Sequence, residues 1–307
     1  MSAGAASPPG EPEAAAATWD ALLAASGLPR IEARALLEQV SGHGRSWLIA
    51  HGNEAAPRDC ATRFAELAHR RREGEPLAYL LGFREFHGLR LRVSPAVLIP
   101  RADTELLVDL AIGRAPAGGR LLDLGTGSGA VALAVAAARP DLGIAATDLS
   151  AAALAIAAGN AGDCLGTSAA ARSGGPLRWL SGSWWAALPA SEPPFDLIAS
   201  NPPYIAEGDP HLARGDLRHE PAQALASGPE GLDAIREIAA GARAHLAPDG
   251  WLLVEHGFEQ GPAVRAIFEA AGLVQVATHR DAQARERVTG GRRAPNPIRL
   301  TLDARRP

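Results

Sequence analysis

The sequence predicts an α/β fold whose larger part is a mostly parallel, seven-stranded sheet, preceded by a small helical domain and a β-hairpin connector. Three observations support this fold class. After residue 116, short apolar segments alternate with Ala-rich helical ones, which is the rhythm of βαβ units. Before residue 79, apolar side chains recur at helical spacing. A chain of 307 residues also exceeds one average domain, so two folded units are expected.

The composition argues against several classes of protein. A formal charge of −4 disfavours a pervasive basic surface for nucleic acid. The two cysteines, Cys60 and Cys164, form no Cys-x-x-Cys pair, so we expect no disulfide framework, no metal site and a reducing, cytoplasmic compartment. Residues 1–17 lack the basic and apolar regions of a signal peptide and are rich in Ala, Pro, Gly and Glu, which predicts a disordered tail. No apolar run is long enough to span a membrane.

Residues 18–82 are predicted to form the helical domain. Their apolar positions follow a helical period that is interrupted at Gly42–Gly44 and at Pro57. The basic run His69–Arg72 falls at the end of the last predicted helix of this domain. Two interpretations of the run stay open: favourable charge at a helix C-terminus, or a patch for an acidic or nucleic-acid-bearing partner.

Residues 83–100 are predicted to form the connector, and residues 101–307 the α/β domain. Segment 83–93 alternates around His87-Gly88, which is typical of a β-hairpin. A helix is then expected to begin near Asp103-Thr104-Glu105, where acidic side chains occupy the first turn.

The strands of the sheet are predicted from apolar runs bounded by turn residues. They fall at residues 120–124, 143–148, 177–181, 195–200 and 250–255, with a closing pair near 273–279 and 297–302. Helices are expected after the first, second, fourth and fifth strands. Residues 162–176 are rich in Gly, Ser and Ala, which predicts a mobile surface loop.

A glycine-rich loop follows the first predicted strand and opens an Ala-rich helix. Its glycines, in the run Gly125–Gly129, let the backbone come close to a ligand. Asp148 ends the next strand, where its carboxylate can accept both hydroxyl groups of a ribose. This pattern fits either a dinucleotide or S-adenosylmethionine. Trp184, after the third strand, can lie against an adenine or pack beside the strand end, and both readings stay open.

The fourth predicted strand ends in Asn201-Pro202-Pro203-Tyr204, a turn that suits an amide nitrogen as substrate. Such a nitrogen is a poor nucleophile because its lone pair is delocalised, so it must be held with that lone pair aimed at the methyl group it attacks. The Asn201 side-chain oxygen and the Pro202 carbonyl can each accept one N–H, while Tyr204 can stack on the planar group. A nicotinamide-dependent oxidoreductase has no comparable need, so the turn favours a methyltransferase.

Together these motifs resemble the protein glutamine methyltransferases that modify peptide-chain release factors. The similarity extends over residues 77–288. It rests on Glu85-Phe86-His87-Gly88-Leu89, Val97–Arg101, Gly125–Gly129, Asn201–Ile205, Glu220-Pro221, Gly231-Leu232-Asp233 and Glu255-His256-Gly257. The Asn-Pro-Pro-Tyr turn alone is shared with enzymes that methylate amino groups of DNA or RNA bases. The hairpin and the Ile-Pro-Arg stretch are more specific to the release-factor group.

The resemblance implies a Rossmann-like class I S-adenosylmethionine-dependent methyltransferase domain and a substrate-recognition role for the helical domain. The residues implied to contact S-adenosylmethionine are Gly125, Thr126, Gly127, Ser128, Gly129, Asp148, Trp184 and Asn201. Those implied to hold the target glutamine are Asn201, Pro202, Pro203 and Tyr204, of which Asn201, Pro202 and Tyr204 are catalytic. The implied reaction methylates N5 of the glutamine in the Gly-Gly-Gln loop of peptide-chain release factors, which modulates translation termination. It requires no metal, and neither nucleic acid nor a membrane is an expected partner.

Two rival functions and three local departures from the family remain. An amino-methyltransferase acting on a DNA or RNA base is the alternative enzyme, against which the acidic balance of the chain counts. A non-catalytic scaffold is disfavoured by the intact turn. Ala102-Asp103 stands where the family has Pro-Glu, a change that keeps the charge and loses rigidity. Ser183 stands where the family has an acidic residue before the Trp, so one hydrogen bond to the cofactor is not implied. Residues 281–284 also differ from the family, and the resemblance implies no contacts for that loop.

Overall fold

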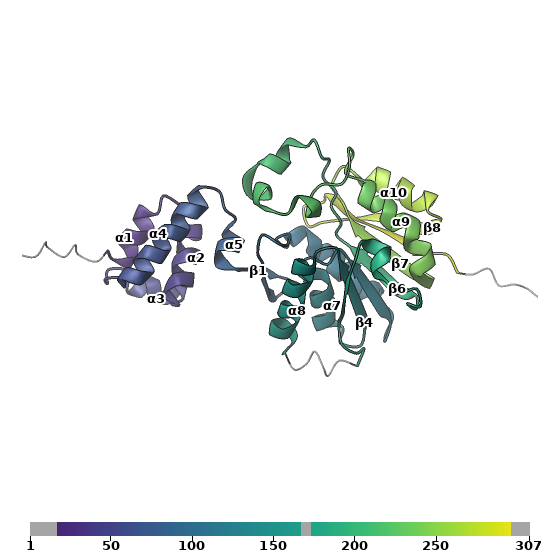
Figure 1. The fold of residues 1–307 in the computed structure, drawn as a ribbon, viewed down its shortest axis with the longest axis horizontal. Helices are drawn as coiled ribbons and strands as arrows, with labels where there is room; N and C mark the ends of the chain where they lie inside the picture. The colour runs from purple at the N-terminus through teal and green to yellow at the C-terminus, as the bar shows by residue number, and fades with distance from the viewer. Residues whose placement is uncertain (1–16, 167–172, 296–307) are drawn as a thin grey trace, which may run out of the picture. The chain divides into compact units, whose positions relative to one another are not determined.

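The structure, a computed structural model, describes residues 17–166 and 173–295 (Figure 1). The chain divides into two compact units, Met1–Leu81 and Gly82–Pro307. Each unit has its own hydrophobic core, and each is described by itself. Within the described residues, no helix is both long and apolar enough to cross a membrane.

The first unit is a bundle of short helices. They are α1 (Trp19–Ala25), α2 (Arg30–Ser41), α3 (Arg45–Ala50), α4 (Arg58–Arg72) and α5 (Leu77–Leu81). Thr18 caps α1 by accepting a hydrogen bond from the Ala21 amide, and α2 ends at Gly42, whose φ of 70° favours glycine. Large side chains fill the centre, among them Trp19, Leu37 and Phe64.

The basic run at the end of α4 is engaged within this unit. Arg70 pairs with Glu75, Arg71 pairs with Glu32, and Arg72 donates to the Ser26 carbonyl. These contacts favour the first of the two interpretations, in which the arginines stabilise the helix end and its neighbours.

The second unit begins with the predicted hairpin, formed by β1 (Phe83–Phe86) and β2 (Leu89–Arg92). His87 and Gly88 both have positive φ, as a tight two-residue hairpin turn requires. The hairpin is bound to helix α8 (Ala151–Leu165), because Asn160 accepts from the Arg92 amide at 2.7 Å and donates to the Arg92 carbonyl at 3.1 Å.

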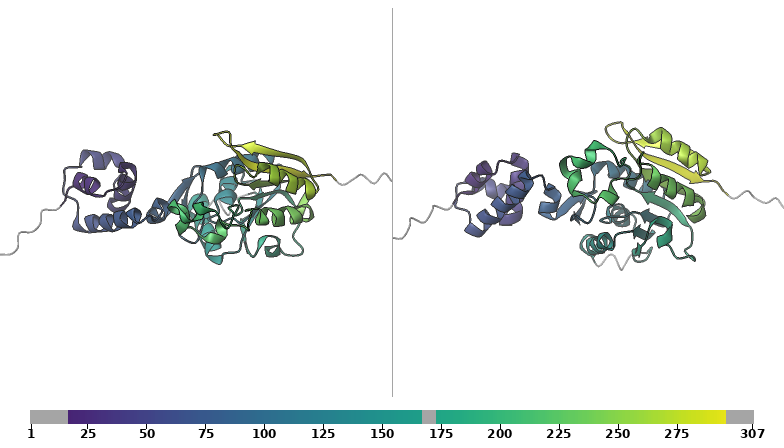
Figure 2. Two further views of the ribbon diagram at one scale, coloured as in Figure 1. Left: turned by 90° about the horizontal axis from the view of Figure 1, so that it is seen from above. Right: turned by 45° about the horizontal axis from the view of Figure 1, so that its top comes forward.

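A seven-stranded sheet forms the centre of the second unit, in the order β5-β4-β3-β6-β7-β9-β8. Its strands are β3 (Arg120–Leu124), β4 (Gly143–Asp148), β5 (Arg178–Ser181), β6 (Phe195–Ser200), β7 (Leu246–Glu255), β8 (Leu273–Arg280) and β9 (Glu286–Arg293). The first five of these are parallel, whereas β9 runs antiparallel to both β7 and β8. Figure 2 shows the last strands of the sheet in yellow, at one edge of the second unit. The predicted fold class, a mostly parallel seven-stranded α/β sheet with a helical region and a hairpin before it, is confirmed.

Helices pack on the sheet to form two apolar clusters. They are α6 (Glu105–Arg114), α7 (Ala130–Ala138), α8, α9 (Asp233–His245) and α10 (Gly261–Ala270). Leu121 of β3 belongs to the cluster that contains α6 and α7, while its neighbour Leu122 belongs to the cluster that contains α9 and α10. This alternation fits a strand that is buried on both faces.

The seventh strand of the sheet is β9, which the sequence analysis did not predict. Residues 297–302 lie outside the described part of the chain, and the strand that pairs with β8 is β9. The sequence of β9 is polar and contains Gly290 and Gly291, so it does not read as a buried strand. The glycines are required by packing, because a Cβ atom at Gly291 would lie 2.9 Å from the Phe268 ring.

The predicted loop over residues 162–176 was wrong at its start. Helix α8 continues through Leu165, and its N-terminus is capped by Ser150, which accepts from the Ala153 amide. Residues 167–172 of that prediction, like residues 1–16 of the predicted tail, lie outside the described residues.

Candidate active site

A cavity of about 360 Å³ opens at the carboxyl ends of the parallel strands in the second unit. Parts of segments 96–104, 123–131, 147–153, 182–184, 201–203 and 221–237 line it. The volume and the position suit a nucleotide-sized ligand, because open α/β sheets bind ligands beyond the carboxyl ends of their strands.

The glycine loop between β3 and α7 forms one wall of the cavity. The amides of Gly125 and Thr126 both donate to the Thr147 carbonyl at 2.9 Å, which ties the loop to the end of β4. Gly127 has a φ of 56°, and a Cβ atom there would meet nothing within 4 Å. The loop therefore exposes bare backbone to the cavity in a conformation that other residues rarely adopt.

Asp123, near the end of β3, fixes the glycine loop through hydrogen bonds. Its carboxylate accepts from Thr126 Oγ1 at 2.6 Å and from the Ala132 amide at 3.1 Å. Burial raises the pKa of Asp123 to about 6, against the opposing effect of these two hydrogen bonds. Asp123 thus supports the loop and the first turn of α7.

Asp148 ends β4 and borders the cavity, as its predicted contact with a ribose requires. Its two oxygens accept from the amides of Gly127 and Ser150, each at 2.8 Å. Because a carboxylate has further lone pairs, both oxygens can also accept from the hydroxyl groups of a ligand.

Leu149 is a cavity residue that the sequence reasoning missed. It follows Asp148 directly, lines the cavity and is 64% exposed. An apolar side chain exposed beside a ribose-binding carboxylate is suited to cover the flat face of a base. The signal was present in the sequence as a leucine placed just outside a strand end.

Trp184 both borders the cavity and packs against the protein, so the two interpretations of this residue are compatible. It lines the cavity, and it lies against the glycine loop so closely that a Cβ atom at Gly125 would be 3.2 Å from its ring. Trp184 also has a positive φ of 40° at the start of a short 3-10 turn, Trp184–Ala187. The ring therefore packs on the loop and forms part of the cavity wall.

The Asn-Pro-Pro-Tyr turn divides between the cavity and the protein interior. Asn201 and Pro203 line the cavity, whereas Pro202 and Tyr204 are not among the lining residues. Asn201 donates from Nδ2 to Thr104 Oγ1 at 3.0 Å, so its oxygen is left as an acceptor. Among the described residues, no donor bonds to the Pro202 carbonyl. The turn thus leaves the Asn201 oxygen as an acceptor at the cavity, while Pro202 is buried outside the cavity lining.

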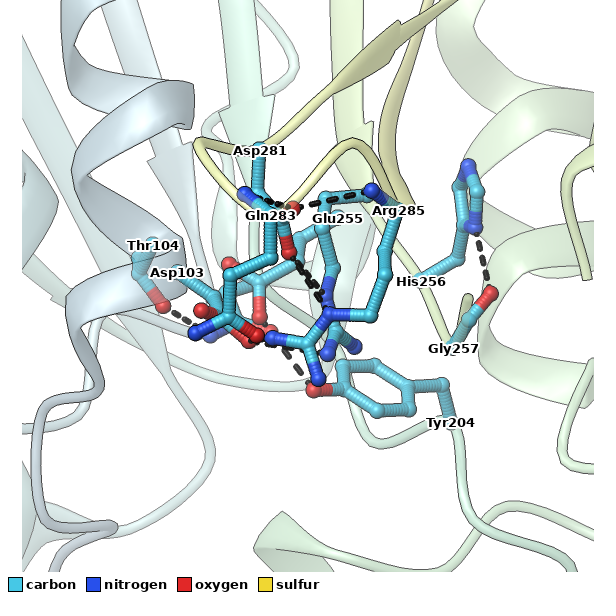
Figure 3. A network of polar contacts seen from close by, with 11 residues as sticks. Asp103, Thr104, Tyr204, Glu255, His256, Gly257, Asp281, Gln283 and Arg285 are labelled. Carbon is cyan, nitrogen blue, oxygen red and sulfur yellow. Dashed lines mark hydrogen bonds and ion pairs between the residues drawn. The ribbon is translucent and has the colours of Figure 1, made fainter. Parts of the chain in front are cut away.

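Tyr204 is held from both ends. Its hydroxyl donates to Glu255 Oε1 at 3.2 Å (Figure 3). Its carbonyl accepts from Gln260 Nε2 at 3.0 Å. Burial raises the pKa of Tyr204 well above its usual value, and the Glu255 carboxylate adds to the effect. The phenol therefore acts as a neutral donor that fixes the turn.

Glu255 and Thr104 are polar residues to which the sequence reasoning gave no role. Glu255 ends β7 and is buried, which raises its pKa to about 7, against hydrogen bonds from Thr104 and Tyr204 and the charge of Arg287. Thr104 precedes α6, is buried and lines the cavity. Neither residue type nor spacing in the sequence indicated that they would meet Asn201 and Tyr204.

Two of the local departures from the family, at Asp103 and in the 281–284 loop, share one ion-pair cluster. Arg287 contacts Asp103 at 2.9 Å and Asp281 at 3.2 Å. Arg285 contacts Asp281 at 3.1 Å (Figure 3). Asp281 also accepts a hydrogen bond from the amide of Gln283, which stabilises the turn of the 281–284 loop. Asp103 and the 281–284 loop therefore support the site through Arg287.

His256 has no free ring nitrogen. Nδ1 contacts the Gly257 carbonyl at 2.8 Å, and Nε2 contacts Thr289 Oγ1 at 2.8 Å. Burial lowers the pKa of His256, which favours a neutral ring. This side chain joins the end of β7 to β9 and takes a structural role.

The loop between β6 and α9 closes one side of the cavity, and Figure 1 shows its short helical turns in green. A bridge between Ile205 and Ala226 ties its two ends. Glu220, whose side chain is fully buried, accepts from the Ile99 amide at 3.0 Å and pairs with Arg101. The segment after Glu220 lines the cavity at Pro221, and the loop is thereby fixed to the Ile-Pro-Arg stretch.

The comparisons with known proteins agree with this architecture. The model of the PrmC N-terminal domain matches residues 14–82, and that of the methyltransferase small domain matches residues 102–230. A release factor glutamine methyltransferase from Bordetella pertussis is 50% identical over 274 residues, which are 88% of this chain and 97% of that protein. Another, from Xylella fastidiosa, is 50% identical over 276 residues, which are 89% of this chain and 97% of that protein.

A solved structure of a protein-(glutamine-N5) methyltransferase (release factor-specific) from Alicyclobacillus acidocaldarius is 29% identical. It covers 67% of this chain and 100% of that chain, with a TM-score of 0.39. The curated relatives match almost along their whole length, and both family models fall on the units that the structure separates. The chain therefore belongs to the family of release factor glutamine methyltransferases.

Proposed function

We propose that this chain transfers a methyl group from S-adenosylmethionine to the side-chain amide nitrogen, N5, of a glutamine in a peptide-chain release factor. The observation that carries the proposal is the Asn201 carboxamide oxygen, an acceptor at a cavity that a glycine loop and Asp148 border. The carbonyl of the next residue, Pro202, accepts from no donor among the described residues and is the second acceptor of the proposal. A primary amide offers two N–H groups, and two acceptors match them.

The cavity residues fit the cofactor. S-adenosylmethionine, when bound, supplies an electrophilic methyl group. Gly127 leaves room for a ligand against the backbone, Asp148 presents two carboxylate oxygens, and Leu149 and Trp184 offer apolar surface on the cavity wall. We assign the binding of the cofactor to these residues and to the rest of the loop Gly125–Gly129.

In the proposed mechanism, the turn orients the amide, and no strong base is used. Acceptors at Asn201 and Pro202 draw electron density toward the nitrogen and fix its direction of approach. The nitrogen gains positive character as it is methylated, and the same two acceptors stabilise its N–H groups until one proton passes to solvent. Tyr204, held by Glu255, stabilises the shape of the turn and can present its ring to the planar amide.

The proposal is tested by mass spectrometry of a release factor incubated with the protein and isotopically labelled cofactor. We expect one labelled methyl group on a glutamine side chain. Matched reactions with single-stranded DNA and RNA test the alternative of a base-amino methyltransferase. Label on a nucleic-acid base and none on the release factor would overturn the proposal.

We also propose that residues 18–82 bind the body of the release factor and that the protein works in the cytoplasm. The match to a separate N-terminal family model and the independent core of the first unit support a distinct role for it. Cys60 and Cys164 are both free thiols, which fits a reducing compartment.

A chain that begins at Phe83 is expected to bind the cofactor, to methylate a short glutamine peptide and to lose most activity on an intact release factor. Equal losses on both substrates would contradict the recognition role.

Asp148→Ala is expected to weaken binding of S-adenosylmethionine by about 2 kcal/mol, because a charge-assisted set of hydrogen bonds is lost. Part of this loss reflects the loop, since Gly127 and Ser150 also lose their acceptor. Isothermal titration calorimetry measures the effect. Asp163→Ala is the matched control, because Asp163 pairs with Arg92 outside the cavity and its loss should leave the affinity unchanged. An unchanged affinity for Asp148→Ala would remove Asp148 from the site.

A further inference from the structure

A line of polar contacts connects the turn to a buried carboxyl group and returns to Asn201 (Figure 3). Tyr204 donates to Glu255 Oε1, and Asn201 donates to Thr104 Oγ1. The Thr104 hydroxyl lies near the Glu255 carboxyl group and lowers its pKa. Glu255 Oε2 is buried and, within the described residues, meets no donor at full hydrogen-bond geometry. A buried acceptor, Glu255 Oε2, thus lies near a hydroxyl group, that of Thr104, which can donate its proton to it.

The direction of these contacts determines which end of the Asn201 carboxamide faces the cavity. A hydroxyl group has one proton, so it donates in one direction and accepts from the other. If Thr104 gives its proton to the Glu255 carboxylate, it can only accept from Asn201. The amide then presents its NH₂ group to Thr104 and its oxygen to the cavity. A reversed hydroxyl would favour the flipped amide, whose NH₂ group would repel the N–H groups of a substrate.

We propose that Glu255 is a positioning residue that acts through the Thr104 hydroxyl to hold the Asn201 carboxamide with its oxygen toward the cavity. The inference rests on the proposed role of Asn201 as an acceptor for the target amide. The inference also explains why the Glu255 carboxyl group is buried near the site without touching the cavity. Burying a charge costs free energy, so a role in the site would offset that cost. The ionised form of Glu255 is the one that accepts from both Thr104 and Tyr204.

The charged groups around Glu255 make this arrangement depend on pH. Arg287 stabilises the carboxylate, Asp103 destabilises it, and His256 is neutral beside it. Tyr204 faces it as a neutral donor. With a pKa of about 7, Glu255 gains a proton as the pH falls through neutrality. The protonated acid can donate to Thr104, which reverses the hydroxyl and disfavours the productive amide. The methylation rate should therefore rise with pH through this range.

A double-mutant cycle separates positioning from a general structural role. Thr104→Val removes the hydroxyl and keeps the shape, so single-turnover methylation of the release factor should fall by about tenfold to a hundredfold. Thr104→Ser restores a hydroxyl and should recover most of that rate. Because Thr104 acts through Asn201, adding Thr104→Val to Asn201→Ala should cause no further loss. Additive losses, or a wild-type rate for Thr104→Val, would overturn the inference.

Glu255→Gln provides an independent test. If Glu255 were purely structural, replacing it would not alter how the methylation rate depends on pH. The burial that raises the folded-state pKa means that ionisation opposes folding, so stability falls as the pH rises from about 4.5 to about 7. The neutral variant should therefore melt at a higher temperature than the wild type near pH 8 and at a similar temperature near pH 5. Its methylation rate should be lower near pH 8, and the rise with pH should be absent. A slower variant with the wild-type pH profile would refute the role.

The outcomes also separate this inference from the proposed function. If Asn201→Ala methylates the release factor at the wild-type rate, the proposed role of the turn fails. If Asn201→Ala is inactive while Thr104→Val and Glu255→Gln behave as the wild type, the positioning role alone fails. Calorimetric titration with S-adenosylmethionine, performed on every variant, shows that a slower rate does not arise from lost cofactor.

Discussion

Replacement of Asn201 by alanine is expected to lower single-turnover methylation of a release factor by about two to four orders of magnitude, as loss of other preorganised catalytic groups does. The variant loses the acceptor that orients the target amide. It also removes the donor to Thr104, but the remaining hydroxyl can rotate toward Glu255. Rapid-quench measurement with saturating cofactor isolates the chemical step. A wild-type rate under these conditions would show that the turn does not orient the substrate.

Asn201→Asp is the informative partner of the alanine variant. Its carboxylate keeps an acceptor near the amide, so substrate binding should survive better than in Asn201→Ala. The new anion would stabilise the sulfonium charge of the cofactor more in the ground state than in the transition state, where that charge is dispersed. The rate should therefore fall while the affinity for the cofactor is kept. A rate above that of the alanine variant with weaker cofactor binding would contradict this reasoning.

The second large effect is expected for Gly231→Ala, which should destabilise the protein by about 3 kcal/mol or more and abolish most of its activity. Gly231 has a φ of 70°, and a Cβ atom there would lie 2.2 Å from the Tyr204 carbonyl oxygen. The same atom would approach Gln260 Nε2, which holds that carbonyl. Because the contact is with backbone, the whole turn must move to relieve it.

Thermal melting and methylation assays measure this effect, with Gly113→Ala as the control. Gly113 is an exposed residue of α6, and a Cβ atom there meets nothing within 4 Å. Alanine at this helical position should raise the stability by up to about 1 kcal/mol without changing activity. Equal melting temperatures for Gly231→Ala and the wild type would show that the turn tolerates displacement.

The sequence predicted the parts of the candidate site that consist of contiguous motifs. The glycine loop, Asp148 and the Asn-Pro-Pro-Tyr turn could be placed at strand ends because each follows an apolar run directly. Thr104 and Glu255 could not be assigned a role in this way. They come from different parts of the chain, and their chemistry arises only when α6, β6 and β7 bring them together.

The fold was predicted for similar reasons, and the failure to predict β9 has a physical cause. Strands buried on both faces, such as β3 and β6, show as apolar runs. In β9 the packing space is occupied by Phe268 and Leu253 from neighbouring elements, so glycine replaces the expected apolar residues. Hydrophobicity therefore gave no indication of this strand, and an apolar segment beyond it was chosen instead.

The position of β9 in the sheet has a consequence for the synthesis of the protein on the ribosome. β9 is the last described strand in the chain, yet it lies between β7 and β8. As the polypeptide emerges from its N-terminus, the glycine loop and the Asn-Pro-Pro-Tyr turn are made well before residues 286–293. Until those residues emerge, β8 has no neighbour within the sheet, and Arg287 and Thr289 cannot reach Asp103 and His256. The nascent chain thus carries its catalytic motifs without the network that supports them, and activity should appear only after translation has passed β9.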